Sequence, residues 1–386
     1  MQFLRNTVDK LKKPFLKGGK LERYEKGFQA IETFLFVPNH TTKHGAHVRD
    51  GIDLKRTMMI VVIALVPALL FGMYNIGYQH FSQVEGSDLS LMHLFGYGFW
   101  KVLPSIIVSY AVGLGIDFAF AIWRNHDVNE GYLVSGLLIP MIMPIDLPLW
   151  LLAVSVVFAV VIGKEVFGGT GMNIFNPALL ARAFAFFSYP NFMSGDKVWV
   201  SDAMTTDGMS GATVLGSLAQ NITPSYSTMD MFLGLIPGSV GETSKLAIII
   251  GALILVATVI GSWKIMLSGV IGAVVTVFAF NAVGLNELMN FSWYNHLMVG
   301  GFAFAIVFMA TDPVSAAQTE RGKWMYGFLV GFFTIMIRIF NPAYPEGAML
   351  AILLMNAVAP TIDYYVVNSN IVKRKKRMKT NPLKTA

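Results

Sequence analysis

The sequence predicts an all-α polytopic membrane protein of about ten transmembrane helices in two inverted five-helix repeats. Of its 386 residues 54% are hydrophobic and only 13% are charged, which is typical of a chain that crosses a bilayer several times. The pentapeptide Ile-Phe-Asn-Pro-Ala occurs at 174–178 and again at 339–343. This internal echo indicates two related halves, and an odd number of helices per half requires opposite orientations.

Apolar runs mark the candidate membrane helices, because about 20 apolar residues cross one bilayer. In chain order the runs are Thr57–Tyr78, Lys101–Trp123, Gly131–Met143, Pro148–Gly163, Pro177–Tyr189, Leu246–Trp263, Ile265–Val283, His296–Ala310, Trp324–Phe340 and Glu346–Val367. The third and fifth runs are short, and such runs are often re-entrant, broken or buried in protein. The number of crossings could therefore also be about eight or nine.

The apolar runs divide the chain into five parts. We expect a cytoplasmic N-terminal extension (1–56), a first membrane repeat (57–189), an outer loop (190–245), a second membrane repeat (246–367) and a basic cytoplasmic tail (368–386). Most of the 29 Lys and Arg residues lie at the two ends of the chain and in alternate loops. The positive-inside rule then places both termini in the cytoplasm and the outer loop on the opposite side.

Composition excludes several classes of function. The chain has no cysteine, so it cannot hold an iron–sulfur cluster through thiolates, and any electron carrier must be an organic cofactor or a metal with other ligands. The formal net charge of +6 does not indicate binding of nucleic acid. The densest basic run, 373–377, directly follows the last apolar run and is suited to anionic membrane lipid.

The repeated pentapeptide predicts two helix starts that face the centre of the membrane. In each copy Asn is suited to cap the helix and Pro to occupy its first turn, at Asn176–Pro177 and at Asn341–Pro342. Helix N-termini favour electron-rich ligands, such as the pyrimidine edge of a flavin or a quinone carbonyl. The alternative is an ordinary helix boundary, for which Asn-Pro is common.

A glycine-rich run precedes the first copy of the pentapeptide. The glycines of residues 168–171 permit close approach of the backbone to a flat ring, and the run matches neither a Walker motif nor a dinucleotide fingerprint. Asn173 and Asn176 offer amide donors and acceptors to an isoalloxazine ring or to a hydroxylated side chain. We therefore expect a cofactor site here.

A second candidate site lies in the outer loop at Ser210, Gly211, Ala212 and Thr213. This run resembles the acceptor to which a flavin transferase esterifies FMN through its phosphate. Thr213 supplies the hydroxyl, and the two small residues before it let a second enzyme hold the backbone. The alternative is a surface turn, because Gly, Ser and Thr also form turns.

The chain as a whole resembles one known family. The matching runs are His47–Asp50, Asp53–Arg56, Val128–Gly131, Lys164–Ala178, Ser210–Thr213 and Ala310–Ala316. They are similar to those of the NqrB/RnfD family. Its members are the NqrB membrane component of the Na⁺-translocating NADH:quinone oxidoreductase and, less closely similar here, the RnfD component of the related Rnf complex. The long charged N-terminal extension favours the first of these.

The resemblance implies a function and a set of cofactors. It implies an FMN esterified to Thr213, a noncovalent riboflavin near Asn173 and Asn176, a quinone as substrate and coupled export of Na⁺ across the inner membrane of a bacterium. The chain would be one subunit of an enzyme and inactive alone. Its expected partners are a subunit with NADH, FAD and iron–sulfur sites, a second FMN-carrying subunit, small membrane subunits and a flavin transferase.

Ionisable residues in or near the predicted spans are candidates for the ion path, because burying charge in a membrane is costly. By the resemblance, Glu130, Asp312 and Asp363 occupy positions where the family carries acidic residues implicated in ion uptake. The alternatives are a capping role for Asp312 and structural ion pairs for Arg182 and Arg338. We assign no catalytic residue and no resident metal site.

Three other functions stay open on the sequence alone. One is an RnfD-like subunit of a ferredoxin:NAD oxidoreductase. Another is a channel or carrier for a small polar solute, lined by the paired Asn-Pro-Ala helix starts. The third is a scaffold that anchors partner subunits.

Overall fold

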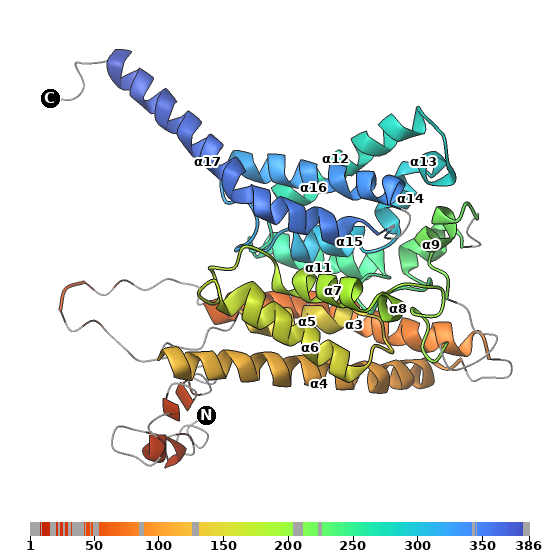
Figure 1. The fold of residues 1–386 in the computed structure, drawn as a ribbon, viewed down its shortest axis with the longest axis horizontal. Helices are drawn as coiled ribbons and strands as arrows, with labels where there is room; N and C mark the ends of the chain where they lie inside the picture. Colours follow the sequence, from red (N-terminus) through yellow and green to blue (C-terminus); the bar gives the residue numbers. More distant parts are fainter. Residues whose placement is uncertain are drawn as a thin grey trace.

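The structure is a computed structural model. It describes residues 54–84, 89–125, 131–203, 211–222, 226–341, 344 and 346–380, together with scattered residues between 8 and 48. In this described part all regular elements are helices, joined by turns and irregular connections, and no residue of it lies in a β-strand (Figure 1). The prediction of an all-α protein is confirmed.

The helices carry the labels of Figure 1. In chain order they are η1 (Lys13–Phe15), α3 (Leu54–Phe81), α4 (Leu91–Arg124), α5 (Tyr132–Ile142), α6 (Leu149–Val160), η3 (Val161–Glu165), α7 (Pro177–Ser188), α8 (Pro190–Met193), α9 (Val214–Ala219), α10 (Thr228–Leu233), α11 (Lys245–Ala257), α12 (Trp263–Asn281), α13 (Glu287–Asn290), α14 (Trp293–Met298), α15 (Phe302–Phe304), η4 (Ala305–Met309), α16 (Glu320–Phe340) and α17 (Ala348–Thr380). The elements η3 and η4 are π-helical turns.

Among the described residues, five helices are long and apolar enough to cross a membrane: α3, α4, α12, α16 and α17. The shorter apolar helices α5, α7 and α11 accompany them. Every predicted run coincides with one or more of the helices, although several of these are too short to cross a bilayer alone. The chain is thus a polytopic membrane protein, as predicted.

Some predicted boundaries are wrong. The sixth run ends as a helix at Ala257, because Thr258 caps α11 and Val259 adopts a φ of 59° that no α-helix continues. The eighth run is divided into α14, α15 and η4, with Gly300 at a φ of 61° in the break. At the other end of the chain, α17 continues through Thr380 into the predicted basic tail.

The first copy of the pentapeptide starts a helix, as predicted. The side chain of Asn176 accepts hydrogen bonds from the backbone N–H groups of Ala178 (3.0 Å) and Leu179 (3.3 Å). Pro177 occupies the first position of α7, where it has no hydrogen bond to lose. The cap fixes the direction in which the Asn176 amide points.

The second copy does not start a helix, and this correction has a physical reason. Asn341 ends α16, and α17 begins only at Ala348; the Pro and Ala of this copy lie outside the described residues. The Nε of Arg338 donates to the carbonyl of Glu346 (3.0 Å). This hydrogen bond ties the connection between α16 and α17 back to the last turn of α16, a contact that the local Asn-Pro signal does not include.

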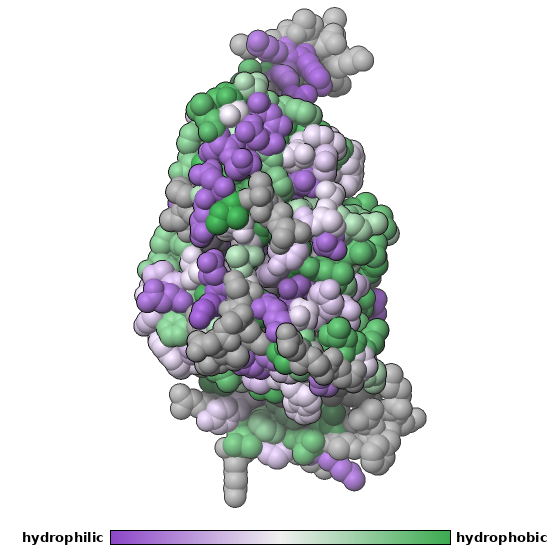
Figure 2. Space-filling model, turned by 90° about the vertical axis from the view of Figure 1, so that its right-hand side faces the viewer, coloured by the Kyte–Doolittle hydropathy of each residue, from purple (hydrophilic) through white to green (hydrophobic). Residues whose placement is uncertain are grey.

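Two groups of helices form the body of the molecule. In the first group α3 and α6 pack along α4, and in the second α12 and α17 pack along α16, while α11 packs on α3 and joins the groups (Figure 1). The C-terminal part of α17 projects from this body (Figure 1). Seen from the end where α9 and α13 lie, hydrophilic residues run down the middle and hydrophobic ones gather toward the flanks (Figure 2). Such flanks are suited to lipid.

Candidate functional site

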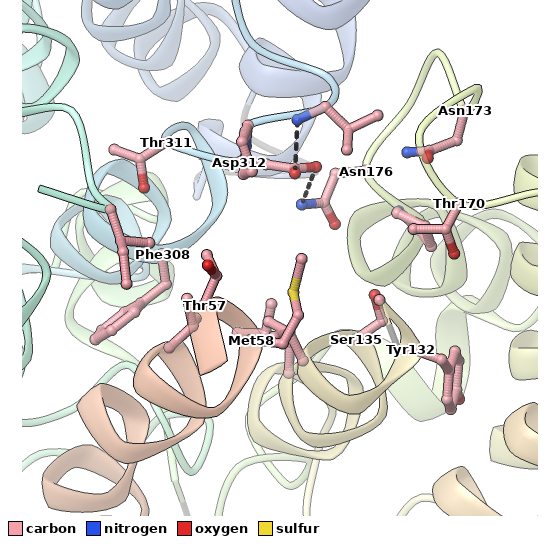
Figure 3. A pocket seen from close by; sticks show the side chains of 18 of the residues that line it. Thr57, Met58, Tyr132, Ser135, Thr170, Asn173, Asn176, Phe308, Thr311 and Asp312 are labelled. Carbon is pink, nitrogen blue, oxygen red and sulfur yellow. Dashed lines mark hydrogen bonds between the residues drawn. The ribbon is translucent and has the colours of Figure 1, made fainter. Parts of the chain in front are cut away.

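The first candidate site forms where α7 meets the loop after η4. The amide Nδ2 of Asn176 donates to Oδ2 of Asp312 at 3.4 Å (Figure 3). The same carboxylate accepts the backbone N–H of Val314 (3.1 Å) and the hydroxyl of Ser315 (2.8 Å). The turn after η4 therefore presents a carboxylate held by neutral donors, and the predicted capping role of Asp312 is limited to this local turn.

A pocket of about 80 Å³ surrounds this pair. Its walls come from the first turn of α3, the first turns of α5, the loop before α7 and the π-helical turn η4 (Figure 3). Hydroxyls, amides, one amine and one carboxylate provide its polar lining: Thr57, Ser135, Lys164, Thr170, Asn173, Asn176, Thr311 and Asp312. Two predicted riboflavin residues and one predicted ion residue are thus brought together.

Of the two charged side chains that line this pocket, Lys164 has an ion-pair partner and Asp312 has none among the described residues. Lys164, in η3, is buried and pairs with Asp117 of α4 at 2.5 Å, so its charge is balanced away from the pocket centre. Among the described residues no basic side chain forms an ion pair with Asp312. The pocket therefore holds one carboxylate whose hydrogen-bond partners are all neutral groups, which favours a positively charged ligand.

The polar atoms of the pocket suit a hard monovalent cation. Such cations prefer oxygen ligands, and carboxylate, hydroxyl and amide oxygens are all present. The hydroxyl of Thr170 is buried and has no hydrogen-bond partner among the described residues. Over the same part of the chain no three His, Asp or Glu side chains lie close enough to hold a metal ion, so the pocket lacks the donor set of a transition-metal site.

A complete flavin is larger than this space. Ligand pockets usually measure ~300–1,000 Å³, whereas about 80 Å³ takes a cation with its water or one edge of a ring. Asn173 itself is engaged locally, donating to the Phe175 carbonyl at 3.0 Å and accepting the Gly171 N–H at 3.4 Å. The residues fit the edge of a flavin and not its whole ring.

Asp363, another predicted ion residue, does not line this pocket. The carboxylate of Asp363, on α17, accepts the backbone N–H groups of Gln318 (2.7 Å) and Thr319 (2.9 Å) and the Thr319 hydroxyl (2.5 Å). Thr319 in turn caps α16. Asp363 therefore links α17 to the start of α16. Glu130 lies outside the described residues.

The second candidate site is Thr213, at the start of α9. Its hydroxyl oxygen accepts the N–H of Gly216 (3.1 Å), and the residue is half-buried. A cavity of about 230 Å³ adjoins it. Thr213 is the N-cap of the short helix α9, so the alternative of a surface turn takes the form of a helix start here.

Gly211 fixes the backbone that leads to Thr213. Its N–H donates to the Asp196 carbonyl at 2.7 Å, and a Cβ at this position would lie 2.5 Å from Cγ2 of Val200. Only glycine fits there without displacing a neighbour. Ala212 is half-buried, and Ser210 lies outside the described residues.

The two candidate sites lie near opposite ends of α3. Thr57 and Met58, in its first turn, line the Asp312 pocket. Asn75, toward its other end, donates to the Ile236 carbonyl (3.0 Å), and Ile236 lines a small cavity beside Thr213. At 1.5 Å per residue these parts of α3 are about 26 Å apart, close to the thickness of a bilayer core.

Sequence reasoning misses some residues of both sites. Thr57, Ser135 and Thr170 carry no distinguishing pattern, and only the fold assembles their hydroxyls. For Arg182 the sequence leaves open an ion-path role or an ion pair, and the structure gives the pair: it binds Glu242 at 2.6 Å and also Glu346. The sequence feature that points to this ion pair is the position of the charged Arg182 inside an apolar run.

Comparisons with known proteins agree with this architecture. A protein of Chromohalobacter salexigens, named as the B-subunit of Na(+)-translocating NADH-quinone reductase, is 47% identical over 400 residues, covering 97% of this chain and 96% of that protein. Proteins of the same name from Stutzerimonas stutzeri (44% identical; 96% and 98% covered) and Klebsiella pneumoniae (43%; 97% and 99%) are also similar. Residues 41–372 match the NQR2, RnfD, RnfE family. The chain is therefore a member of the NQR2, RnfD, RnfE family.

Proposed function

We propose that this chain is the quinone-reducing membrane subunit of a sodium-pumping NADH:quinone oxidoreductase. It would carry FMN on Thr213, hold riboflavin near Asn173 and Asn176, and couple electron transfer to quinone with export of Na⁺. Similarity along nearly the whole chain to proteins named as the B-subunit of such an enzyme supports the assignment. The bound flavins would supply the electron transfer, and the chain would bind and orient them.

The half-buried hydroxyl of Thr213 beside a cavity is the observation that carries the FMN proposal. The experiment is to coexpress the chain with its partner subunits and a flavin transferase. The denatured subunit should fluoresce on a gel and gain the mass of one FMN, less water, and Thr213→Ala should remove both signals. Ser217→Ala, in the same short helix, is a matched control that should keep them. A wild-type chain without the mass increment would refute the assignment.

Riboflavin near Asn173 and Asn176 is supported by their place in a pocket that accepts one edge of a ring. Replacing Asn173 by Ala should lower the extractable flavin and leave the covalent FMN intact. Asn176→Ser retains an N-cap for α7, removes the amide donor and adds no second carboxylate beside Asp312, so a loss of riboflavin in this variant cannot be ascribed to a lost cap. Full riboflavin in both variants would place the cofactor elsewhere.

The Asp312 pocket supports a role for this chain in Na⁺ binding. The ion would be held by the carboxylate and nearby hydroxyl oxygens, such as that of Thr311. Glu130 and Asp363 are further proposed members of the ion path. For Asp363 the capping contacts offer a competing explanation, which a separate measurement can resolve.

The proposed orientation places both termini in the cytoplasm of a bacterium, with Thr213 outside the inner membrane. The position of the two sites near opposite ends of α3 supports it. The proposed partners are the NADH, FAD and iron–sulfur subunit, the second FMN-carrying subunit, small membrane subunits and membrane lipid. The channel alternative loses its main support, because Asn341 ends a helix. The names of the relatives favour this assignment over an RnfD-like one.

A further inference from the structure

The C-terminal part of α17 leaves the body of the molecule. The carboxylate of Asp363 accepts the backbone N–H of Thr319 (2.9 Å), the residue that caps the start of α16. Beyond this contact α17 continues and stands clear of the other described helices (Figure 1). Within 364–378 every residue except Val366 is exposed. This projecting segment (364–378) is about 22 Å long, at 1.5 Å per residue.

A bilayer does not account for the apolar side chains of the projecting segment. About 20 residues cross a bilayer core, so α17, which begins at Ala348, has crossed it by about Val367. Two Asn and one Ser follow, and then five consecutive basic residues, 373–377. Such residues stay outside the hydrocarbon core. Ile371 and Met378, which are 45% and 60% exposed, therefore lie in water unless a partner covers them.

The apolar side chains of the segment gather in one narrow stripe. Tyr364, Val367, Ile371 and Met378 follow the alternating steps of three and four residues of a heptad pattern. At about 100° per residue they fall within about 60° of the helix circumference. Of the exposed apolar residues beyond Val367, only Val372 lies off this stripe. A stripe of this width is typical of a helix that packs along one other helix, whereas a helix lying in lipid has a larger apolar face.

Positive charge lies in the stripe and beside it. Arg374 occupies the position of the pattern between Ile371 and Met378, and Lys375 borders it; both are exposed. Residues 364–386 contain no Asp or Glu, so the segment has no carboxylate of its own to face these side chains. A guanidinium in an apolar seam requires an acidic partner when the seam is covered. The charge pattern therefore specifies what covers the stripe.

We propose that the projecting segment of α17 docks a helix of a partner subunit, one that has a narrow apolar stripe and carboxylates opposite Arg374 and Lys375. The inference rests on the proposed function in that the chain must work within a complex. A second copy of this segment would place like charges opposite one another. Anionic lipid would not distinguish the stripe from the other sides of the helix, because the five consecutive basic residues surround it.

The test uses the fact that the chain contains no cysteine, so one introduced thiol reports on one position. Ile371→Cys lies on the stripe, and Ser369→Cys, the matched control, lies on the opposite side of the same turn of helix. The complex purified in detergent is treated with a water-soluble maleimide, and the mass of this subunit gives the rate of labelling. Ile371→Cys should react about tenfold more slowly than Ser369→Cys, because a covered thiol reacts only when the interface opens.

Two comparisons show what covers the stripe. In the full chain produced without other subunits, in the same detergent, Ile371→Cys and Ser369→Cys should react at similar rates. Equal rates within the complex would overturn the proposal. Protection that appears only after transfer into vesicles of anionic lipid would also overturn it, since lipid would then be the occupant.

A charge reversal tests the chemistry of the partner. Arg374→Glu should speed the labelling of Ile371→Cys several-fold or release a subunit from the purified complex, because it faces carboxylates. Lys373→Glu, on the far side of the helix, changes the net charge equally and should do neither. Equal effects of the two reversals would assign the basic residues to lipid or to membrane topology and would overturn the docking surface.

The same mass spectra separate this inference from the FMN assignment. A subunit that lacks the FMN increment but protects Ile371→Cys within the complex retains the docking surface and refutes the ester on Thr213. A subunit that carries FMN and is labelled equally at both positions refutes the docking surface alone.

Discussion

Asn176 and Asp312 are 136 positions apart in the chain, and the amide of the first donates to the carboxylate of the second at 3.4 Å. Asn176 begins α7, which packs on α6 of the first group of helices, whereas Asp312 follows η4, which contacts α12 and α17 of the second. Any movement of one group against the other would alter this contact. The pair therefore places the candidate ion site where the two halves of the molecule meet.

Asp312→Asn should weaken the response to sodium. The substitution preserves the shape of the side chain, replaces one of its two accepting oxygens by an amide NH2, and removes the only carboxylate among the described residues that line the pocket. Losing a charge-assisted contact costs about 1–3 kcal/mol, so the Na⁺ concentration for half-maximal stimulation of quinone reduction should rise roughly tenfold. Glu320→Gln, an exposed carboxylate on α16 that pairs with Lys264 and Lys323, is the control. An unchanged sodium response in Asp312→Asn would remove it from the ion path.

Asp363→Asn tests whether this carboxylate acts in the fold or in ion transfer. It accepts three hydrogen bonds from Gln318 and Thr319, so the substitution should destabilise the protein by about 1–3 kcal/mol. The measurements are thermal unfolding in detergent and sodium titration of the same preparation. A lower melting temperature with an unchanged half-saturating Na⁺ concentration supports the capping role. A shifted sodium response at unchanged stability would place Asp363 on the ion path.

Local sequence patterns predict those features of the fold that depend on residues close together in the chain. The apolar runs indicate the helices, and Asn176–Pro177 indicates the start of α7, because a cap requires only residues within one turn. The same signal fails at Asn341, which ends α16 and lies in a connection held by the hydrogen bond from Arg338 to the carbonyl of Glu346, beyond the reach of one helical turn.

The composition of each site depends on contacts that no local pattern reveals. The run ending at Thr213 can be identified because its residues are adjacent in the sequence. Thr57 and Ser135 cannot, since isolated hydroxyls in apolar helices are ordinary and only the packing of α3 on α5 brings them to one pocket. The partners of Arg182 are likewise hidden, because Glu242 and Glu346 come from distant connections.

Acid should loosen the connection between α7 and α9 near Asp202. Partial burial disfavours the charge of this carboxyl, but hydrogen bonds from Lys101 (2.8 Å) and Tyr97 (2.7 Å) outweigh it and lower its pKa. A carboxyl with a lowered pKa in the folded state stabilises the fold above its unfolded value, about 3.9, and this contribution is lost as the pH falls below that value. Protease cleavage within 190–203 should therefore increase several-fold below about pH 4.

A variant separates this effect from general acid unfolding. The side chain of Asp202→Asn is uncharged at every pH, like the protonated carboxyl. Cleavage of this variant should therefore be raised already at neutral pH and should vary little over the same interval. Parallel pH profiles for the wild type and Asp202→Asn would assign the acid sensitivity to other groups.

Gly211→Ala should reduce attachment of FMN without altering Thr213 itself. The added methyl group would lie 2.5 Å from Cγ2 of Val200, so either the loop or the valine must move, at a cost of about 1–3 kcal/mol. The resulting shift displaces the Thr213 hydroxyl from the position at which the transferase meets it. The mass of the subunit measures the fraction that carries the ester. Adding Val200→Ala removes the contacting methyl group and should restore much of the attachment, because the obstacle is steric. Full attachment of FMN in Gly211→Ala would contradict this account. So would a double variant that carries as little FMN as the single one, and the space at Gly211 would then serve something other than the placement of Thr213.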